Sequence, residues 1–208
     1  MKIKAVIFDM DGVLIDAKDW HYEALNSALS LFGAEINRQD HLSTFDGLPT
    51  KKKLELLSLK NGLPLGLHSF IGALKQQFTF EAIFAKCNPV FQHQFALSQL
   101  KKDGYKLAVA SNSISQTVNI MMEKAGLVNY LDFCLSSDDV TKSKPDPEIY
   151  LMAIKKLNLA PAECLIVEDN EHGIKAALDS GAHLLKVKDT TDVTYHRIIK
   201  RIQELEND

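Results

Sequence analysis

The chain has 208 residues, of which 46% are hydrophobic and 25% are charged. This is the composition of globular domains and excludes an intrinsically disordered chain. Its 24 basic and 27 acidic residues give a formal net charge of -3. Nucleic acid is therefore not an expected partner, because no excess of positive charge is available for a phosphate backbone.

Neither secretion nor a membrane location is indicated. No uncharged stretch reaches the roughly 18 apolar residues that a spanning helix needs, and acidic residues interrupt the apolar run at 5–8, unlike in a signal peptide. The cysteines, Cys87, Cys134 and Cys164, are odd in number and widely separated, which argues against a disulfide framework or a zinc ribbon. We expect a cytoplasmic protein.

Short, continuous apolar runs are typical of strands in a parallel sheet covered on both faces. Five such runs lie at 3–8, 107–110, 131–135, 165–167 and 184–187. Helical patterns at 115–125, 147–157 and 172–180 separate the last four runs, and a polar helix is expected from 194 to the C-terminus. This alternation predicts an α/β fold with a Rossmann-like, doubly wound parallel sheet.

The interval between the first two strands is too long for one crossover. It holds about a hundred residues where about a dozen would suffice, and its apolar residues recur at helical spacing in 20–32, 50–60 and 69–85. The pattern predicts a small, inserted α-helical cap domain at 16–86, with the core formed by 1–15 and 87–208.

Polar residues stand where the predicted strands end, which is where open parallel sheets bind ligands. They are Asp9 and Asp11 after the first strand, Ser111 and Asn112 after the second, and Glu168 and Asp169 after the fourth, while Lys144 lies on the loop that opens the helix after the third. Taken alone, each has an ordinary explanation, such as helix capping by Ser111 or a solvated loop for Lys144. Together and in this order they indicate one site, where the cluster of carboxylates would be costly without a cation.

The four motifs resemble the signatures of the haloacid dehalogenase superfamily, in particular its phosphatase and β-phosphoglucomutase-like branch with a helical cap after the first strand. They read Asp9-Met10-Asp11-Gly12-Val13, Ser111-Asn112, Lys144-Pro145-Asp146-Pro147-Glu148, and Glu168-Asp169 followed by Gly173, Ala176 and Ala177. The resemblance implies a Mg²⁺-dependent phosphatase acting on a small, phosphosugar-like metabolite.

The resemblance also implies roles for individual residues. Asp9 would attack phosphorus to form an aspartyl-phosphate, and Asp11 would be the general acid and base. Mg²⁺ would take the Asp9 carboxylate, the Asp11 backbone carbonyl, Asp169, and Glu168 either directly or through water. Lys144 and the Ser111 hydroxyl would balance the remaining charge, and Asn112 would contact the substrate. The second aspartate, Asp11, disfavours carbon–halogen chemistry, because haloalkanoate dehalogenases of this superfamily lack it.

A sugar phosphomutase is the alternative enzyme. His21 falls where the mutase cap carries a histidine, but Thr50 and Ile114 stand where mutases have an arginine and a lysine. Threonine cannot replace an arginine that holds a second phosphate, so a hydrolase is favoured. Lys51, at the start of a predicted cap helix, is a further candidate for substrate contact, with a solvated helix face as the competing explanation.

Two readings from other classes are weaker. A catalytically silent regulatory or binding relative would be expected to have lost some of the catalytic residues, and all are present. A phosphorylated receiver domain would have neither the cap insertion nor the Asp9-x-Asp11 spacing. The identity of the substrate and the oligomeric state do not follow from the sequence.

Overall fold

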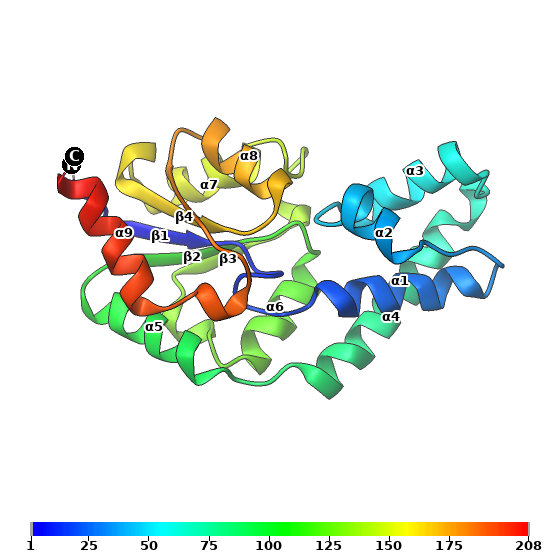
Figure 1. The fold of residues 1–208 in the computed structure, drawn as a ribbon, viewed down its shortest axis with the longest axis horizontal. Helices are drawn as coiled ribbons and strands as arrows, with labels where there is room; N and C mark the ends of the chain where they lie inside the picture. Colours follow the sequence, from blue (N-terminus) through cyan, green and yellow to red (C-terminus); the bar gives the residue numbers. More distant parts are fainter. Residues whose placement is uncertain (1, 208) are drawn as a thin grey trace. The chain divides into compact units, whose positions relative to one another are not determined.

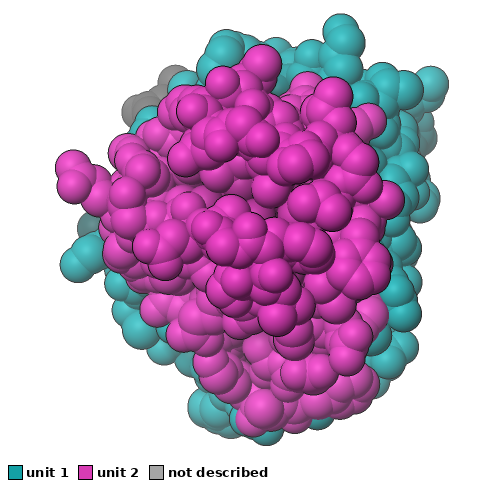
Figure 2. All heavy atoms as spheres, turned by 90° about the vertical axis from the view of Figure 1, so that its right-hand side faces the viewer, with its two compact units in different colours: residues 1–16, 88–208 teal, residues 17–87 magenta. Residues whose placement is uncertain are grey.

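The computed structural model describes residues 2–207. The chain divides into two compact units, which are coloured separately in Figure 2. An α/β unit comprises residues 1–16 and 88–208, and a helical unit comprises residues 17–87. Each end of the helical unit lies one residue further along the chain than the predicted range 16–86. None of the helices in the described range is long and apolar enough to cross a membrane.

The α/β unit is built on a parallel sheet of five strands within the described residues. The strands are β1 (Ala5–Phe8), β2 (Lys106–Ala110), β3 (Phe133–Leu135), β4 (Cys164–Glu168) and β5 (His183–Lys186). Each lies within two residues of its predicted run, and the predicted α/β fold class is confirmed.

Helices cover both faces of this sheet, which is why every residue of β1 and β4 is buried. The helices α7 (Glu148–Leu157) and α8 (Glu171–Asp179) lie on one face. The other face carries α5 (Phe91–Lys102), α6 (Ser115–Lys124) and α9 (Tyr195–Asn207), as Figure 1 shows. Short 3₁₀ turns join the elements at Val128–Tyr130, Ser137–Asp139, Pro161–Glu163 and Thr190–Asp192.

The strand register places a continuous apolar layer under α7 and α8. Ala5 pairs with Cys164 and Ile7 with Ile166, so alternate residues of β1 and β4 point to the same face. Their side chains belong to one buried cluster with residues of the two helices, including Ile149, Tyr150, Ala153, Ile154, Leu157, Ala176 and Ala177. This cluster packs α7 against the sheet and places the Tyr150 hydroxyl next to Glu168, the last residue of β4.

Helix α5 was not predicted from the sequence. Its buried residues, His93, Ala96, Leu97 and Leu100, follow a helical spacing, but Phe91 and Phe95 are exposed at its start. Because exposed phenylalanines and a buried histidine invert the usual amphipathic pattern, the periodicity of this segment is weak.

The helical unit contains α1 (Lys18–Ser30), α2 (Arg38–Asp40), a π-helical turn (His41–Phe45), α3 (Thr50–Asn61), a 3₁₀ turn (Leu65–Leu67) and α4 (His68–Lys86). Its three long helices lie within two residues of the predicted ones. Helices α1 and α4 run side by side, and an apolar cluster that includes Leu25, Leu29, Phe45, Leu54 and Ile71 holds the unit together.

The strand order β3-β2-β1-β4-β5 creates a switch point beside β1. The chain proceeds from β1 through β2 to β3, and then returns to place β4 on the other side of β1. Helical connections therefore leave in opposite directions above β1 and β4, and this is the crevice where open α/β sheets bind ligands.

Candidate active site

The loop after β1 brings two aspartates to the switch point. The N–H of Asp9 still donates to the carbonyl of Val167 on β4 (3.0 Å), so Asp9 is held in the sheet ladder. The next residues form a tight loop in which the carbonyl of Met10 accepts the N–H groups of Leu14 and Ile15 (2.9 Å each). Gly12 has φ 89°, a conformation that glycine adopts without strain.

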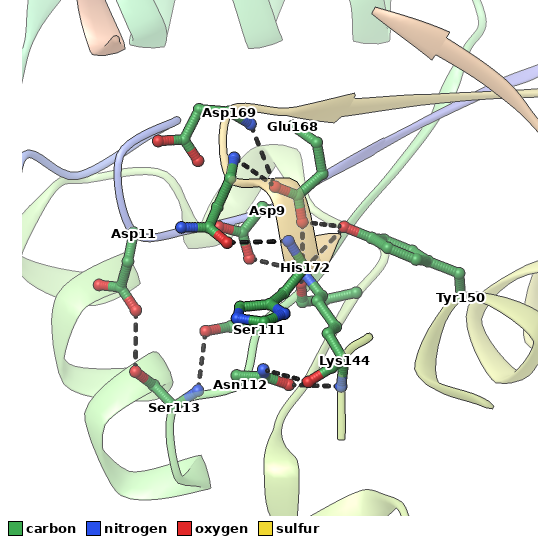
Figure 3. A network of polar contacts seen from close by, with 12 residues as sticks. Asp9, Asp11, Ser111, Asn112, Ser113, Lys144, Tyr150, Glu168, Asp169 and His172 are labelled. Carbon is green, nitrogen blue, oxygen red and sulfur yellow. Dashed lines mark hydrogen bonds and ion pairs between the residues drawn. The ribbon is translucent and has the colours of Figure 1, made fainter. Parts of the chain in front are cut away.

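Lys144 is the centre of a buried polar network, shown in Figure 3. Only 4% of this residue is exposed. Its Nζ lies 2.7 Å from Asp9 Oδ1, 2.7 Å from Glu168 Oε1, 2.8 Å from the carbonyl oxygen of Ala110 and 2.8 Å from the hydroxyl of Tyr150. An ammonium group has three N–H donors, so these four oxygens share them.

Both carboxylate oxygens of Glu168 accept hydrogen bonds. Oε1 accepts from Lys144 Nζ and from the Tyr150 hydroxyl (2.6 Å), while Oε2 accepts from the backbone N–H groups of Asp169 (3.1 Å) and Asn170 (3.4 Å). Asn170 also caps α8, since its side chain accepts the N–H of His172 (3.0 Å). The turn that leads into α8 thus fixes the position of the Glu168 carboxylate.

The end of β2 organises the loop that carries Lys144. The amide of Asn112 spans the backbone of Lys144, since Oδ1 accepts its N–H (3.0 Å) and Nδ2 donates to its carbonyl (3.3 Å). The buried Ser111 hydroxyl accepts the N–H of Ser113 (3.0 Å). The Ser113 hydroxyl in turn donates to Asp11 Oδ2 (2.8 Å), which ties the acid/base candidate to β2.

Charge is unevenly balanced in this network. Burial, with the nearby Glu168 carboxylate, raises the pKa of Asp9 well above its usual value, and Lys144 opposes the rise. Burial alone would lower the pKa of Lys144, but the carboxylates of Asp9 and Glu168 raise it, so the ammonium stays charged. Burial and the Glu168 charge also raise the pKa of Tyr150, whose hydroxyl stays a donor. The carboxylates of Asp9, Glu168 and Asp169 outnumber the single ammonium group of Lys144.

The model of the haloacid dehalogenase-like hydrolase family matches residues 6–187, a span that contains every one of these polar groups. The chain belongs to this family.

Relatives of this hydrolase include phosphatases and phosphomutases. A phosphorylated carbohydrates phosphatase from Thermotoga maritima is 30% identical over 182 residues, covering 86% of this chain and 82% of that protein. β-Phosphoglucomutase from Bacillus subtilis is 27% identical over 188 residues, covering 86% of this chain and 80% of that protein. These relatives place the hydrolase in the phosphatase and β-phosphoglucomutase-like branch.

Solved structures share the fold. A β-phosphoglucomutase from Clostridium difficile superposes with a TM-score of 0.85 at 23% identity, covering 99% of this chain and 100% of that one. The Rossmann-like core with a helical insertion is therefore the fold of this haloacid dehalogenase-like hydrolase.

The acidic residues of the hydrolase can hold a divalent metal ion. Asp9, Glu168 and Asp169 each offer a carboxylate oxygen, and these three atoms lie within 4.8 Å of one another. Hard cations such as Mg²⁺ prefer oxygen ligands of this kind, and the two positive charges would offset the excess of carboxylate over ammonium. The donor set therefore fits such an ion.

Two of the predicted site residues lie in the helical unit of the hydrolase. His21 is on α1, and its Nδ1 lies 3.2 Å from Nζ of Lys75, a buried lysine on α4. Lys51 is exposed near the start of α3. The other predicted residues all lie in the α/β unit. Lys144 is in the loop before α7, and the rest are at or just after the ends of β1, β2 and β4: Asp9, Asp11, Ser111, Asn112, Glu168 and Asp169.

Sequence reasoning missed Tyr150 and Lys75, and it assigned no role to Ser113. Tyr150 stands among the apolar residues of α7 and has the pattern of a packing residue. One available signal was that a buried tyrosine hydroxyl needs a hydrogen-bond partner. Lys75 gave none, because its contact with His21 depends on the packing of α4 against α1.

Proposed function

We propose that the chain is a phosphatase that hydrolyses the phosphate ester of a small, phosphosugar-like metabolite. The observation that carries the proposal is Lys144, whose ammonium joins Asp9 and Glu168 at 2.7 Å each beside Asp169, at the carboxyl ends of β1 and β4. The relatives named as phosphatases, including one for phosphorylated carbohydrates, support this choice of substrate class.

Phosphoryl transfer needs an aligned nucleophile, compensation of negative charge and a proton for the leaving oxygen. Asp9 supplies the nucleophile. Because Lys144 holds Oδ1, we assign the attack to Oδ2, which forms a bond to phosphorus while the ester P–O bond breaks. Water then attacks the aspartyl-phosphate, releasing inorganic phosphate and restoring the Asp9 carboxylate.

Asp11 moves the protons. It donates one to the leaving oxygen in the first step and accepts one from the attacking water in the second. The Ser113 hydroxyl, 2.8 Å from Oδ2, keeps this carboxyl group oriented. Ser111 and Lys144 provide the hydroxyl and the cation that offset charge on the phosphate oxygens.

A Mg²⁺ ion would bind to Asp9, Asp169 and the backbone carbonyl of Asp11. We propose that Glu168 acts through water, because both of its oxygens already accept hydrogen bonds. The bound ion supplies charge neutralisation that lets a carboxylate approach a phosphate dianion. The amide of Asn112 is engaged with the Lys144 backbone, so we propose that it positions this loop in addition to any substrate contact.

Sugar phosphomutase is the second candidate, since β-phosphoglucomutases are among the relatives. Thr50, the first residue of α3, and Ile114, which precedes α6, lack the charge that a second phosphate would need at these positions. We therefore favour hydrolysis, with His21 and Lys51 as substrate contacts.

The thiols support a cytoplasmic location. Cys87, Cys134 and Cys164 are odd in number and widely separated in the sequence, a pattern that suits a reducing compartment, and on this ground we propose a cytoplasmic location.

The test is release of inorganic phosphate from a panel of sugar phosphates, nucleotides and phosphoacids, with Mg²⁺ or with a chelator. Native protein should release phosphate only with Mg²⁺, and Asp9→Asn should be inactive. Asp179→Asn, which alters an exposed ion pair with Lys175 on α8, is the matched control and should stay active. No release from any substrate would overturn the proposal. Isomerisation of a hexose 1-phosphate primed with its bisphosphate, at a rate above hydrolysis, would favour the mutase.

A further inference from the structure

The hydroxyl of Tyr150 is hydrogen-bonded to two charged groups of the site, Lys144 and Glu168. Tyr150 lies on α7 and is completely buried. Its hydroxyl donates to Glu168 Oε1 (2.6 Å) and accepts a hydrogen bond from Lys144 Nζ (2.8 Å), as Figure 3 shows. The same ammonium lies 4.6 Å from the centre of the tyrosine ring.

A packing role explains the ring but not the hydroxyl. The ring belongs to the apolar cluster between the sheet and α7, where phenylalanine would fill nearly the same space. A buried hydroxyl costs free energy unless it is hydrogen-bonded. Here its bonds go to a carboxylate and an ammonium of the site, and hydrogen bonds to ionised groups are the strong ones.

The hydroxyl also decides how the Lys144 donors are distributed. Three N–H groups serve four oxygens, one of which belongs to Tyr150. Without this hydroxyl, the ammonium would turn further toward Asp9 and Glu168, and Glu168 Oε1 would lose its second donor. Asp9 would then be engaged more fully by Lys144 and be less available to a metal ion, and Glu168 would lose one of the contacts that fix its carboxylate.

We propose that Tyr150 is a positioning residue for the metal site. Its hydroxyl holds Glu168 and Lys144 in place, so that Asp9 and Asp169 keep their affinity for a divalent cation. This inference rests on the Mg²⁺ site of the proposed function. Groups that orient metal ligands typically contribute about 10–100-fold to metal affinity or activity.

The test is a calorimetric titration of substrate-free protein with Mg²⁺. Tyr150→Phe should raise the dissociation constant about tenfold or more. Two controls separate other causes. Tyr195→Phe removes a hydroxyl that donates to Asp103 Oδ2 (2.7 Å) outside the site, and Ile154→Val loosens the same apolar cluster without touching a polar group. Both should bind Mg²⁺ like the native protein.

An increase beyond threefold that is confined to Tyr150→Phe supports the inference. A smaller increase in the dissociation constant overturns the inference and leaves the proposed function standing. If Ile154→Val weakens Mg²⁺ binding as much as Tyr150→Phe does, the cause is a general packing effect and the inference is likewise overturned. If the native protein itself binds no Mg²⁺, the metal site of the proposed function fails together with this inference.

Discussion

The carboxylate of Glu168 packs directly against the backbone of Gly173 on α8, leaving no room for a side chain. A Cβ at Gly173 would lie 1.8 Å from Oε1, 2.1 Å from Cδ and 2.4 Å from Oε2. Since Asp169 and Asn170, the two residues before α8, also donate backbone N–H groups to Glu168, the helix entry and the carboxylate are fixed together. Glycine at this position is thus a requirement of the site and not of the helix.

Gly173→Ala should damage both the fold and the activity. The added methyl group must displace Glu168 or α8, and overpacking of this kind costs about 1–3 kcal/mol of unfolding free energy. Urea unfolding and phosphate release measure the two effects. Gly72→Ala is the control, because Gly72 lies inside α4 with no atom within 4 Å of its Cβ position. The free energy of unfolding of Gly72→Ala should exceed that of the native protein by about 0.5–1 kcal/mol. Equal behaviour of the two variants would contradict the close contact.

Lys144→Met should destabilise the α/β unit strongly. Removing one partner of a buried ion pair costs about 3–5 kcal/mol, because the Asp9 and Glu168 carboxylates stay buried without their cation. Lys101→Met breaks an ion pair of the same length, 2.7 Å to Asp132, with both side chains more than a third exposed. This control should cost no more than about 1 kcal/mol. Similar losses in urea unfolding would show that the Lys144 network is not buried as described.

Ser113→Ala should slow turnover without preventing substrate binding. The hydroxyl donates to Asp11 Oδ2, and one such hydrogen bond contributes about 1 kcal/mol, or roughly a fivefold effect on kcat. KM should change little, because the bond acts on the acid/base group. Ser30→Ala, which removes an exposed hydroxyl bonded to the Ser27 carbonyl, serves as control. A raised KM at unchanged kcat would instead identify Ser113 as a substrate-binding residue.

His41 should make the stability of the helical unit depend on pH. It is buried, and burial, with Lys53, lowers its pKa from 6.5 to about 4. The unfolded chain therefore binds the proton more readily, so stability is full above pH 6.5 and falls as the pH drops toward 4. His41→Gln should flatten this fall in urea unfolding curves, whereas His196→Gln, at an exposed position on α9, should not. An unchanged slope in His41→Gln would refute the assignment.

Much of the site followed from the sequence because parallel strands end at one edge of a sheet. Asp9, Ser111 and Glu168 each come directly after a buried apolar run, and the structure brings them together, although their chemical roles remain predictions. Tyr150 could not be assigned, because its function depends on where α7 lies under the sheet and not on its neighbours in sequence. Helix α5 was not predicted for a different reason, because the exposed Phe91 and Phe95 obscure its amphipathic pattern.

The central claim is that Asp9 is the residue that accepts the phosphoryl group. Native protein turning over a sugar phosphate with Mg²⁺ can be quenched in acid, which preserves acyl phosphates, and reduced with borohydride, which converts a phosphorylated aspartate to homoserine. Peptide mass spectrometry should find this conversion at position 9 and nowhere else. Conversion at another aspartate, or phosphate release by Asp9→Asn at the native rate, would contradict the account.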